Sequence, residues 1–163
     1  MCVKFEGQVW KEGNYWPVEV TALDISTQGK SKKDAYSMMK EAIELHVDRS
    51  GFKVEIVPTS GKTFVVKARG SDNDKYLIAL LLKQQRARHG LSTAEVAKRL
   101  GITAQSLCDL EKGRRIPSIE RAVKIAKKLR EPLETWVTLA ISDMMRAAHL
   151  DLKVEVIKKA SGF

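Results

Sequence analysis

The chain has 163 residues, 44% of them hydrophobic, which suits one or two folded domains and excludes a globally disordered protein. Its longest apolar run, residues 76–82, is too short for a membrane span. Cys2 and Cys108 lack metal-ligand spacing. No disulfide between them is expected, so the protein is predicted to lie in a reducing cytoplasm. The formal net charge of +9 is concentrated in residues 71–132, where 14 Lys and Arg stand against 7 Asp and Glu, which indicates a polyanionic partner.

The first elements of the chain form a predicted β-hairpin. Residues 3–10 alternate with a period of two, which is typical of a strand with one buried face. Gly13 and Asn14 tolerate a positive φ and predict a turn, after which residues 15–20 return as the second strand. Because Pro17 lacks a backbone N–H, this strand is expected either to lie at a sheet edge or to start late.

A helix is predicted after the hairpin. Ser31 is a favourable N-cap, and Asp34 stands three residues after it, as in a variant of the capping box. Apolar residues then recur at helical spacing over about 17 residues, and Gly51 is expected to end the helix. These apolar residues are Ala35, Met38, Met39, Ala42, Ile43 and Val47.

Three further extended segments complete the first part of the chain: residues 24–29, 52–57 and 62–68. Together with the hairpin and the helix, they predict an α+β domain over residues 1–68, a small sheet with one helix on one face. Residues 69–74 contain no large apolar side chain and are expected to form a linker.

After the linker, apolar residues recur at the spacing of a helix, so an all-α domain is predicted over residues 75–148. Ser92 and Glu95 form a capping box, and Thr103 caps the helix that follows. The first helix is expected to bury Leu77, Leu80, Leu81 and Gln84. The five expected helices cover residues 74–89, the segment between Ser92 and Gly101, and residues 104–111, 119–129 and 133–149.

The third of these helices has two different sides. Leu107 and Leu110 share one side of a helical wheel. The other side carries Gln105, Cys108, Asp109 and Lys112. Such a helix is either the solvated surface of an ordinary domain or a reader of the DNA major groove. The basic charge of this segment and the short turn between two capped helices favour the DNA reader.

Residues 77–129 resemble the Cro/lambda-repressor class of helix-turn-helix domain. The resemblance rests on A-x-x-L-G-I-T from Ala97 to Thr103, on L-E-x-G from Leu110 to Gly113, and on the Pro-Ser pair before the fourth helix. It implies that Arg86 and Glu111 form a partly buried ion pair rather than contacting DNA.

The same resemblance implies roles for residues around the third helix. Thr93 would touch phosphate, and Ala104 and Gln105 would face bases, although the Ala104 methyl could contact only a group such as the thymine methyl. Asp109 would either accept from cytosine N4 or only exclude other contacts. The predicted DNA-binding residues are Thr93, Thr103, Ala104, Gln105, Ser106, Asp109, Lys112, Arg114 and Arg115.

Residues 18–48 resemble the HicB antitoxin family of toxin–antitoxin systems. The shared signature is an extended segment ending in T-Q-G at Thr27 to Gly29, followed by a basic, capped helix start. The resemblance implies a truncated ribonuclease-H-like sheet that binds a small RNA-cleaving toxin. The predicted toxin contacts are Trp10, Tyr15, Trp16, Asp24, Thr27 and Gln28. The three aromatic residues are either core or an exposed patch for a protein partner.

The chain is not expected to be an enzyme. A ribonuclease-H site needs carboxylates that converge on divalent metal, and nothing in the spacing of Glu19, Asp24 and Glu44 forces them together. The three histidines stand in separate elements, and no nucleophile arrangement or phosphate loop accompanies them. No metal or cofactor is therefore predicted.

Residues 150–159 alternate again and predict a lone strand after the helical domain. Because such a strand needs a neighbour, residues 149–163 are expected to form a dimerisation strand and tail that pairs with a second copy. A homodimer or higher homo-oligomer would place two reading helices on half-sites about 34 Å apart.

Together, these patterns and resemblances predict an antitoxin with two tasks. It would neutralise a small RNA-cleaving toxin with its first domain and repress its own operon by binding operator DNA with its second. The alternative is a transcriptional regulator whose first domain senses a ligand or another protein.

Overall fold

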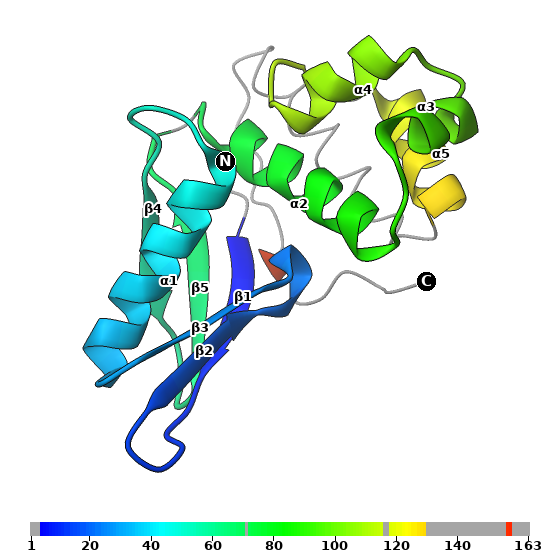
Figure 1. Ribbon diagram of the computed structural model, residues 1–163. Helices are drawn as coiled ribbons and strands as arrows, with labels where there is room; N and C mark the ends of the chain where they lie inside the picture. Colours follow the sequence, from blue (N-terminus) through cyan, green and yellow to red (C-terminus); the bar gives the residue numbers. More distant parts are fainter. Residues whose placement is uncertain (1–3, 71, 116–117, 130–155, 158–163) are drawn as a thin grey trace. The chain divides into compact units, whose positions relative to one another are not determined.

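The computed structural model of the chain describes residues 4–70, 72–115, 118–129 and 156–157 (Figure 1). It divides into two compact units. One unit comprises Cys2–Asp74 with Glu155–Lys159, and the other lies mainly within Lys75–Val154. The helix predicted over residues 133–149 falls outside the described residues.

The first unit is a sheet with the strand order β3-β2-β1-β5-β4, and every neighbouring pair in that order is antiparallel. Helix α1 lies against one face of this sheet (Figure 1). This arrangement confirms the predicted sheet with one helix, while the ribonuclease-H-like assignment stays a prediction. The elements are β1 (Lys4–Val9), β2 (Trp16–Val20), the 3-10 turn η1 (Thr21–Leu23), β3 (Ile25–Gly29), α1 (Lys32–Val47), β4 (Val54–Pro58) and β5 (Thr63–Ala68).

The core of this unit follows from strand alternation. Phe5 and Val9 on β1 are almost completely buried, as the period of two predicts. Gly7 lies opposite Phe64 in the pairing of β1 with β5, and the Phe64 ring fills the space that a side chain at Gly7 would need. Tyr36 of α1 meets the same ring edge to face, with 5.3 Å between the ring centroids, so α1 covers this face of the sheet.

Helix α1 begins as predicted and ends differently. The Ser31 hydroxyl accepts a hydrogen bond from the Asp34 N–H at 3.1 Å, and the Asp34 carboxylate accepts one from the Lys30 N–H. The expectation that Gly51 ends the helix is wrong, because Asp48 takes the left-handed conformation, with a φ of 49°, three residues earlier. Aspartate tolerates this region better than most residues, so it serves as the C-cap here.

The sheet places Pro17 in an interior strand. Strand β2 is hydrogen-bonded to β1 on one side and to β3 on the other, so it is not the edge strand that Pro17 suggested. The alternative of a late start is not borne out either, since β2 begins at Trp16, before Pro17, and Pro17 pairs with Gln28 of β3. A proline at the beginning of a strand removes one N–H without interrupting the central ladder.

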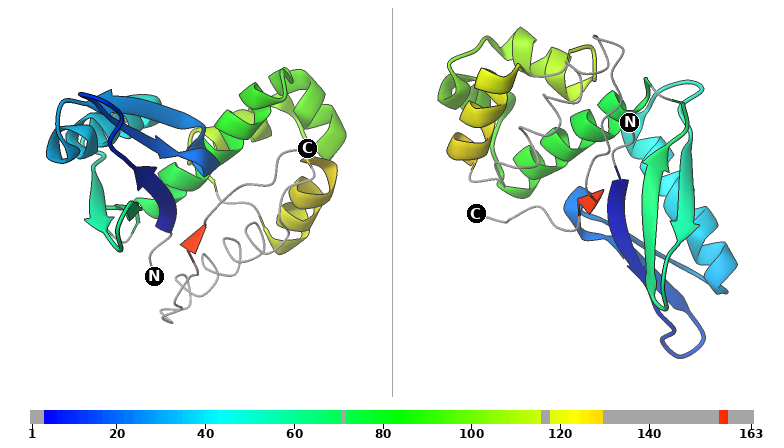
Figure 2. Two further views of the ribbon diagram at one scale, coloured as in Figure 1. Left: turned by 90° about the horizontal axis from the view of Figure 1, so that it is seen from below. Right: turned by 180° about the vertical axis from the view of Figure 1, so that it is seen from behind.

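The C-terminal strand has a partner in its own chain. β6 (Val156–Ile157) pairs in parallel with Lys4 and Phe5 of β1 (Figure 2). The expectation that this strand lacks a neighbour and must pair with a second copy is therefore wrong. The pairing of β1 with β2 begins only at Gln8, so the first half of β1 has backbone groups free for β6.

The second unit contains four described helices: α2 (Asp74–Arg88), α3 (Thr93–Leu100), α4 (Ala104–Glu111) and α5 (Ile119–Leu129). Their positions agree with the first four predicted helices. Leu77, Leu80 and Leu81 of α2 are buried as expected, but Gln85 rather than Gln84 is the fully buried amide. Within the described part of the chain, no helix is long and apolar enough to cross a membrane.

Candidate DNA-binding site

Helices α3 and α4 form a helix-turn-helix. Gly101 ends α3 in the left-handed conformation, with a φ of 65°, which lets the chain turn sharply toward α4. The two helices pack against each other through small and branched apolar side chains. The buried residues at this contact and around it are Val96, Ala97, Leu100, Leu107 and Leu110.

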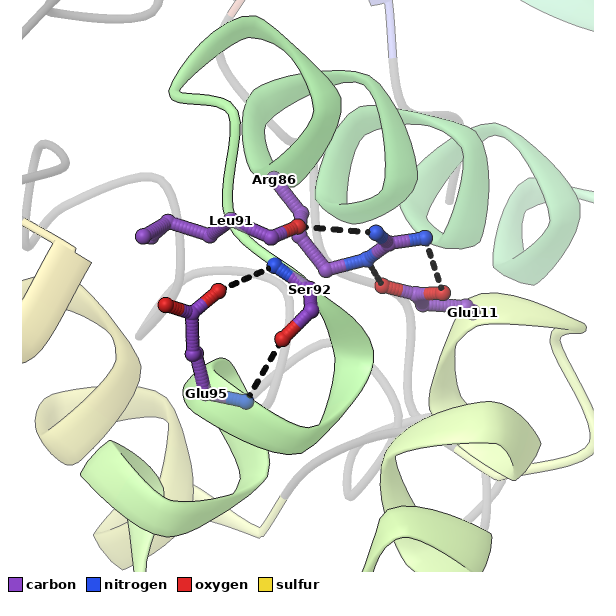
Figure 3. Close-up of polar contacts among 5 residues, drawn as sticks. All are labelled: Arg86, Leu91, Ser92, Glu95 and Glu111. Carbon is purple, nitrogen blue, oxygen red and sulfur yellow. Dashed lines mark hydrogen bonds and ion pairs between the residues drawn. The ribbon is translucent and has the colours of Figure 1, made fainter.

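Both helices begin with the caps that the sequence predicts. The Ser92 hydroxyl accepts from the Glu95 N–H, and the Glu95 carboxylate accepts from the Ser92 N–H at 2.7 Å, which completes the capping box (Figure 3). The backbone hydrogen bond from Ser92 lowers the pKa of Glu95. Thr103 caps α4 through its hydroxyl, which accepts from the Ser106 N–H at 3.1 Å.

An ion pair fixes α4 to the end of α2 (Figure 3). The Arg86 guanidinium donates through Nε and Nη2 to the two carboxylate oxygens of Glu111, at 2.5 and 3.2 Å. Its Nη1 donates to the Leu91 carbonyl at 3.0 Å, just before α3. The Arg86 and Glu111 side chains are only 19% and 10% exposed, so both are structural, as the resemblance implied.

The start of α4 is exposed and carries polar side chains at the positions predicted to bind DNA. Ala104 and Gln105 are exposed, and Thr103 lies beside them at the N-cap. The Thr103 hydroxyl donates to the Ser106 hydroxyl oxygen at 3.0 Å, which leaves the Ser106 proton available to another acceptor. These groups are suited to hydrogen bonding with base edges and phosphates.

Asp109 has partners within the chain. Its Oδ1 accepts from Gln105 Nε2 and from Arg114 Nη1, both at 3.1 Å. The Arg114 hydrogen bond is the main cause that lowers the pKa of Asp109, with the Gln105 hydrogen bond acting in the same direction. The spacing of Gln105 and Asp109 by four residues is a known pairing on helices, and this signal could have been found in the sequence.

Exposed basic side chains precede and follow α4 in the sequence. Lys112, Arg114 and Arg115 are exposed after α4, at the positions predicted to contact phosphates. Lys98 and Arg99 are also exposed, in the last turn of α3, and sequence reasoning did not single them out. Thr93, the remaining predicted contact, is the half-buried first residue of α3.

The six residues predicted to contact a toxin lie around β3 and the hairpin, but not at one point. Tyr15 is 54% exposed, whereas Trp10 and Trp16 are half-buried, so none of the three belongs to the core. Trp16 pairs with Gly29 at one end of β3, and Thr27 and Gln28 follow along the strand. Asp24 lies exposed beyond the other end of β3.

The carboxylates tested as metal ligands do not assemble. Within the described residues, no group of three or more His, Cys, Asp or Glu side chains could hold a metal ion. Glu44 is instead bound by the Lys53 ammonium at 2.7 Å and by the Val54 N–H. Partial burial opposes ionisation of Glu44, but these hydrogen bonds outweigh it and lower its pKa.

Three features define a DNA-binding domain of the helix-turn-helix class: the two capped helices, the Arg86–Glu111 ion pair between α2 and α4, and the exposed polar start of α4 with basic residues after its end. Comparison with known proteins agrees, since the helix-turn-helix family model matches residues 82–136. No solved structure matches the chain.

Two known proteins with similar sequences show the family to which the chain belongs. A transcriptional regulator of the helix-turn-helix type from Methanocaldococcus jannaschii is 46% identical over 46 residues, 28% of this chain and 70% of the relative. Another from Methanothermobacter thermautotrophicus is 44% identical over 55 residues, 33% of this chain and 80% of the relative. The chain therefore belongs to the helix-turn-helix transcriptional regulators. Both relatives are described as transcriptional regulators of the helix-turn-helix type.

Proposed function

We propose that the chain represses its own operon by reading operator DNA with α4 and neutralises a small RNA-cleaving toxin with its first unit. The observation that carries the DNA-binding part is α4 itself, whose start is exposed and polar, whose end is held by the Arg86–Glu111 ion pair, and which is followed by exposed basic side chains. Selection of bound sequences from a random duplex library would identify the operator, and its occurrence upstream of the chain's own gene would support repression. A library that shows no enrichment would refute sequence-specific binding.

Gln105→Ala should reduce base preference at one operator position. The exposed amide can bond a base edge, so its loss should cost about 1–3 kcal/mol on the preferred operator and little on a duplex changed at that position. Fluorescence anisotropy with operators changed one base pair at a time measures this. Gln8→Ala, at an exposed glutamine of the other unit, is the matched control. An unchanged preference at every position would remove Gln105 from the reading residues.

Arg114→Ala should weaken binding to all sequences. The Arg114 side chain is 59% exposed beside α4, and loss of one phosphate contact should reduce the slope of log affinity against log salt by about one unit. The control is Arg69→Ala, which removes an exposed arginine from the other unit. An unchanged slope for Arg114→Ala would assign this arginine to a role within the protein alone.

The proposed toxin-binding part rests on the resemblance of residues 18–48 to HicB antitoxins and on the surface that β3 offers. β3 is the last strand on its side of the described sheet, so its outer backbone groups could pair with a strand of a partner. Exposed Tyr15 beyond its end would add an aromatic contact.

Co-expression with the small protein encoded beside the chain's gene tests this part. Relief of toxicity and joint purification are expected, and Tyr15→Ala should weaken the complex. Leu45→Ala is the matched control, because Leu45 is 70% exposed on α1 and outside the proposed contact. If the neighbour neither binds nor is toxic, a regulator that senses a ligand or another protein becomes the better description.

A two-fold dimer is also part of the proposal, since two copies would address the two halves of a symmetric operator. It does not rest on β6, which pairs with β1 of the same chain. Light scattering of the purified protein measures the oligomeric state, and a monomer at micromolar concentration would refute the dimer.

A further inference from the structure

One carboxylate oxygen joins two side chains of the proposed reading surface. Asp109 Oδ1 accepts hydrogen bonds from Gln105 Nε2 and Arg114 Nη1, both at 3.1 Å. The Asp109 side chain is only 17% exposed, whereas Gln105 and Arg114 are exposed. Asp109 therefore lies under its two partners, and they, rather than Asp109, are available to DNA.

The first consequence concerns the orientation of the Gln105 amide. An ionised carboxylate only accepts hydrogen bonds, so the amide nitrogen, and not the amide oxygen, must face Asp109. One N–H is used in this contact, while the second N–H and Oε1 have no hydrogen-bond partner among the described residues. A free N–H next to a free oxygen is the pair that a glutamine uses to bond N7 and N6 of adenine. The contact thus selects one of the two amide orientations before DNA arrives.

The second consequence concerns Arg114. One of its five N–H donors binds Asp109, which holds the guanidinium beside α4 and leaves the other donors for phosphate. Holding a long side chain in place reduces the entropy lost on binding. The arginine in turn offsets the negative charge of Asp109, which would otherwise repel the DNA backbone.

We propose that Asp109 is a positioning residue that sets base preference by fixing the Gln105 amide for adenine and holding Arg114 toward phosphate. This role differs from the direct contact with cytosine N4 that the sequence suggested. The proposal rests on the proposed DNA-binding function and adds the mechanism by which one base pair is selected.

Asp109→Asn tests the proposal, because it keeps the side-chain shape but lets the Gln105 amide take either orientation. On the selected operator, preference for adenine at the position read by Gln105 should fall about tenfold. Affinity for an unrelated duplex should rise, since a negative charge near phosphates is lost. In the double variant Gln105→Ala/Asp109→Asn, preference at this base pair should equal that of Gln105→Ala alone.

Other outcomes overturn the proposal in distinct ways. An equal gain of affinity on all sequences would make Asp109 a source of repulsion only, and a changed preference at a different base pair would make it a direct reader. If the full wild-type chain showed no sequence preference, the DNA-binding function itself would fail first.

A measurement without DNA keeps the proposal testable if the variant binds poorly. In the wild-type protein, the side-chain ¹H–¹⁵N resonances of Gln105 should shift as Asp109 is protonated. That shift should occur below the usual carboxyl range, because the Arg114 hydrogen bond lowers the Asp109 pKa. If the chemical shifts of the Gln105 side-chain amide do not change as Asp109 is protonated, the contact does not exist in solution.

Discussion

Glu111→Ala is expected to lower the free energy of unfolding of the helix-turn-helix unit by about 3 kcal/mol. The change leaves the largely buried Arg86 guanidinium without the carboxylate that binds two of its nitrogens. The Leu91 carbonyl still accepts from Nη1, but a neutral oxygen offsets only part of the lost interaction. Chemical denaturation followed by circular dichroism and hydrogen exchange of the α3 and α4 amides would measure the loss.

Two further variants separate this effect from the loss of any ion pair. Glu120→Ala removes a carboxylate that is 84% exposed and pairs with Lys124 at 3.5 Å, so it should cost less than about 0.5 kcal/mol. Arg86→Met/Glu111→Leu removes both charges and should recover most of the stability, because the cost comes from the unpaired charge. A loss for Glu111→Ala no larger than that for Glu120→Ala would contradict the structural role of the pair.

The Arg86–Glu111 ion pair also connects the stability of this unit with the proposed DNA reading. Arg86 contacts Glu111 at the end of α4 and the Leu91 carbonyl before α3, so one side chain ties both helices to the end of α2. Reading base edges requires α4 to keep its place against α3. Glu111→Ala should therefore weaken operator binding as well, although Glu111 faces the interior.

Much of the helix-turn-helix could be predicted because its signals are local. The hydroxyl and carboxylate of Ser92 and Glu95 act within one turn, so their order in the sequence already specifies the cap. Leu107 and Leu110 likewise share a side by helical geometry alone, and both are buried. The Arg86–Glu111 pair needed the family resemblance, because 25 residues separate its partners.

The features that the sequence analysis missed depend on competition between nearby groups or on distant pairing. Asp48 and Gly51 can both end a helix by taking the left-handed conformation, and the helix ends at the first of them, Asp48. β6 lies beside the first half of β1 because β2 pairs with β1 only from Gln8 onward. This register cannot be predicted from the local sequence of either strand. The position of Asp109 on the helical wheel predicted that it faces outward toward DNA. In the structure its carboxylate instead accepts hydrogen bonds from Gln105 and Arg114.

The functions proposed for the two units therefore have different kinds of support. The segments shared with the known regulators cover about a third of the chain, and the family match lies wholly beyond the first unit. DNA binding is the property that the family assigns, whereas the proposal of a toxin partner rests on the first unit alone. A variant that damages the first unit can test whether the two activities are separable.

Gly29→Ala should supply that variant, with an expected loss of about 3 kcal/mol in the stability of the first unit. A Cβ at Gly29 would lie 2.2 Å from the Ala35 backbone nitrogen and 2.7 Å from both the Ala35 Cα and the Asp34 carbonyl carbon. These are backbone atoms at the start of α1, so no side-chain rotation can relieve the clash. Either α1 moves away from β3 or the strand shifts, and the buried Ala35 and Met39 lose packing in both cases.

Gly13→Ala is the matched control, because a Cβ there meets no atom within 4 Å and only the φ of 59° is unfavourable. It should cost about 1 kcal/mol. Hydrogen exchange should then rise across β3 and α1 in Gly29→Ala but stay local in Gly13→Ala. If the proposed toxin binds the first unit, its binding should be lost in Gly29→Ala while operator binding persists, because the proposed reading surface belongs to the other unit. A loss of stability no greater than that of the control would show that α1 can withdraw from β3 at little cost.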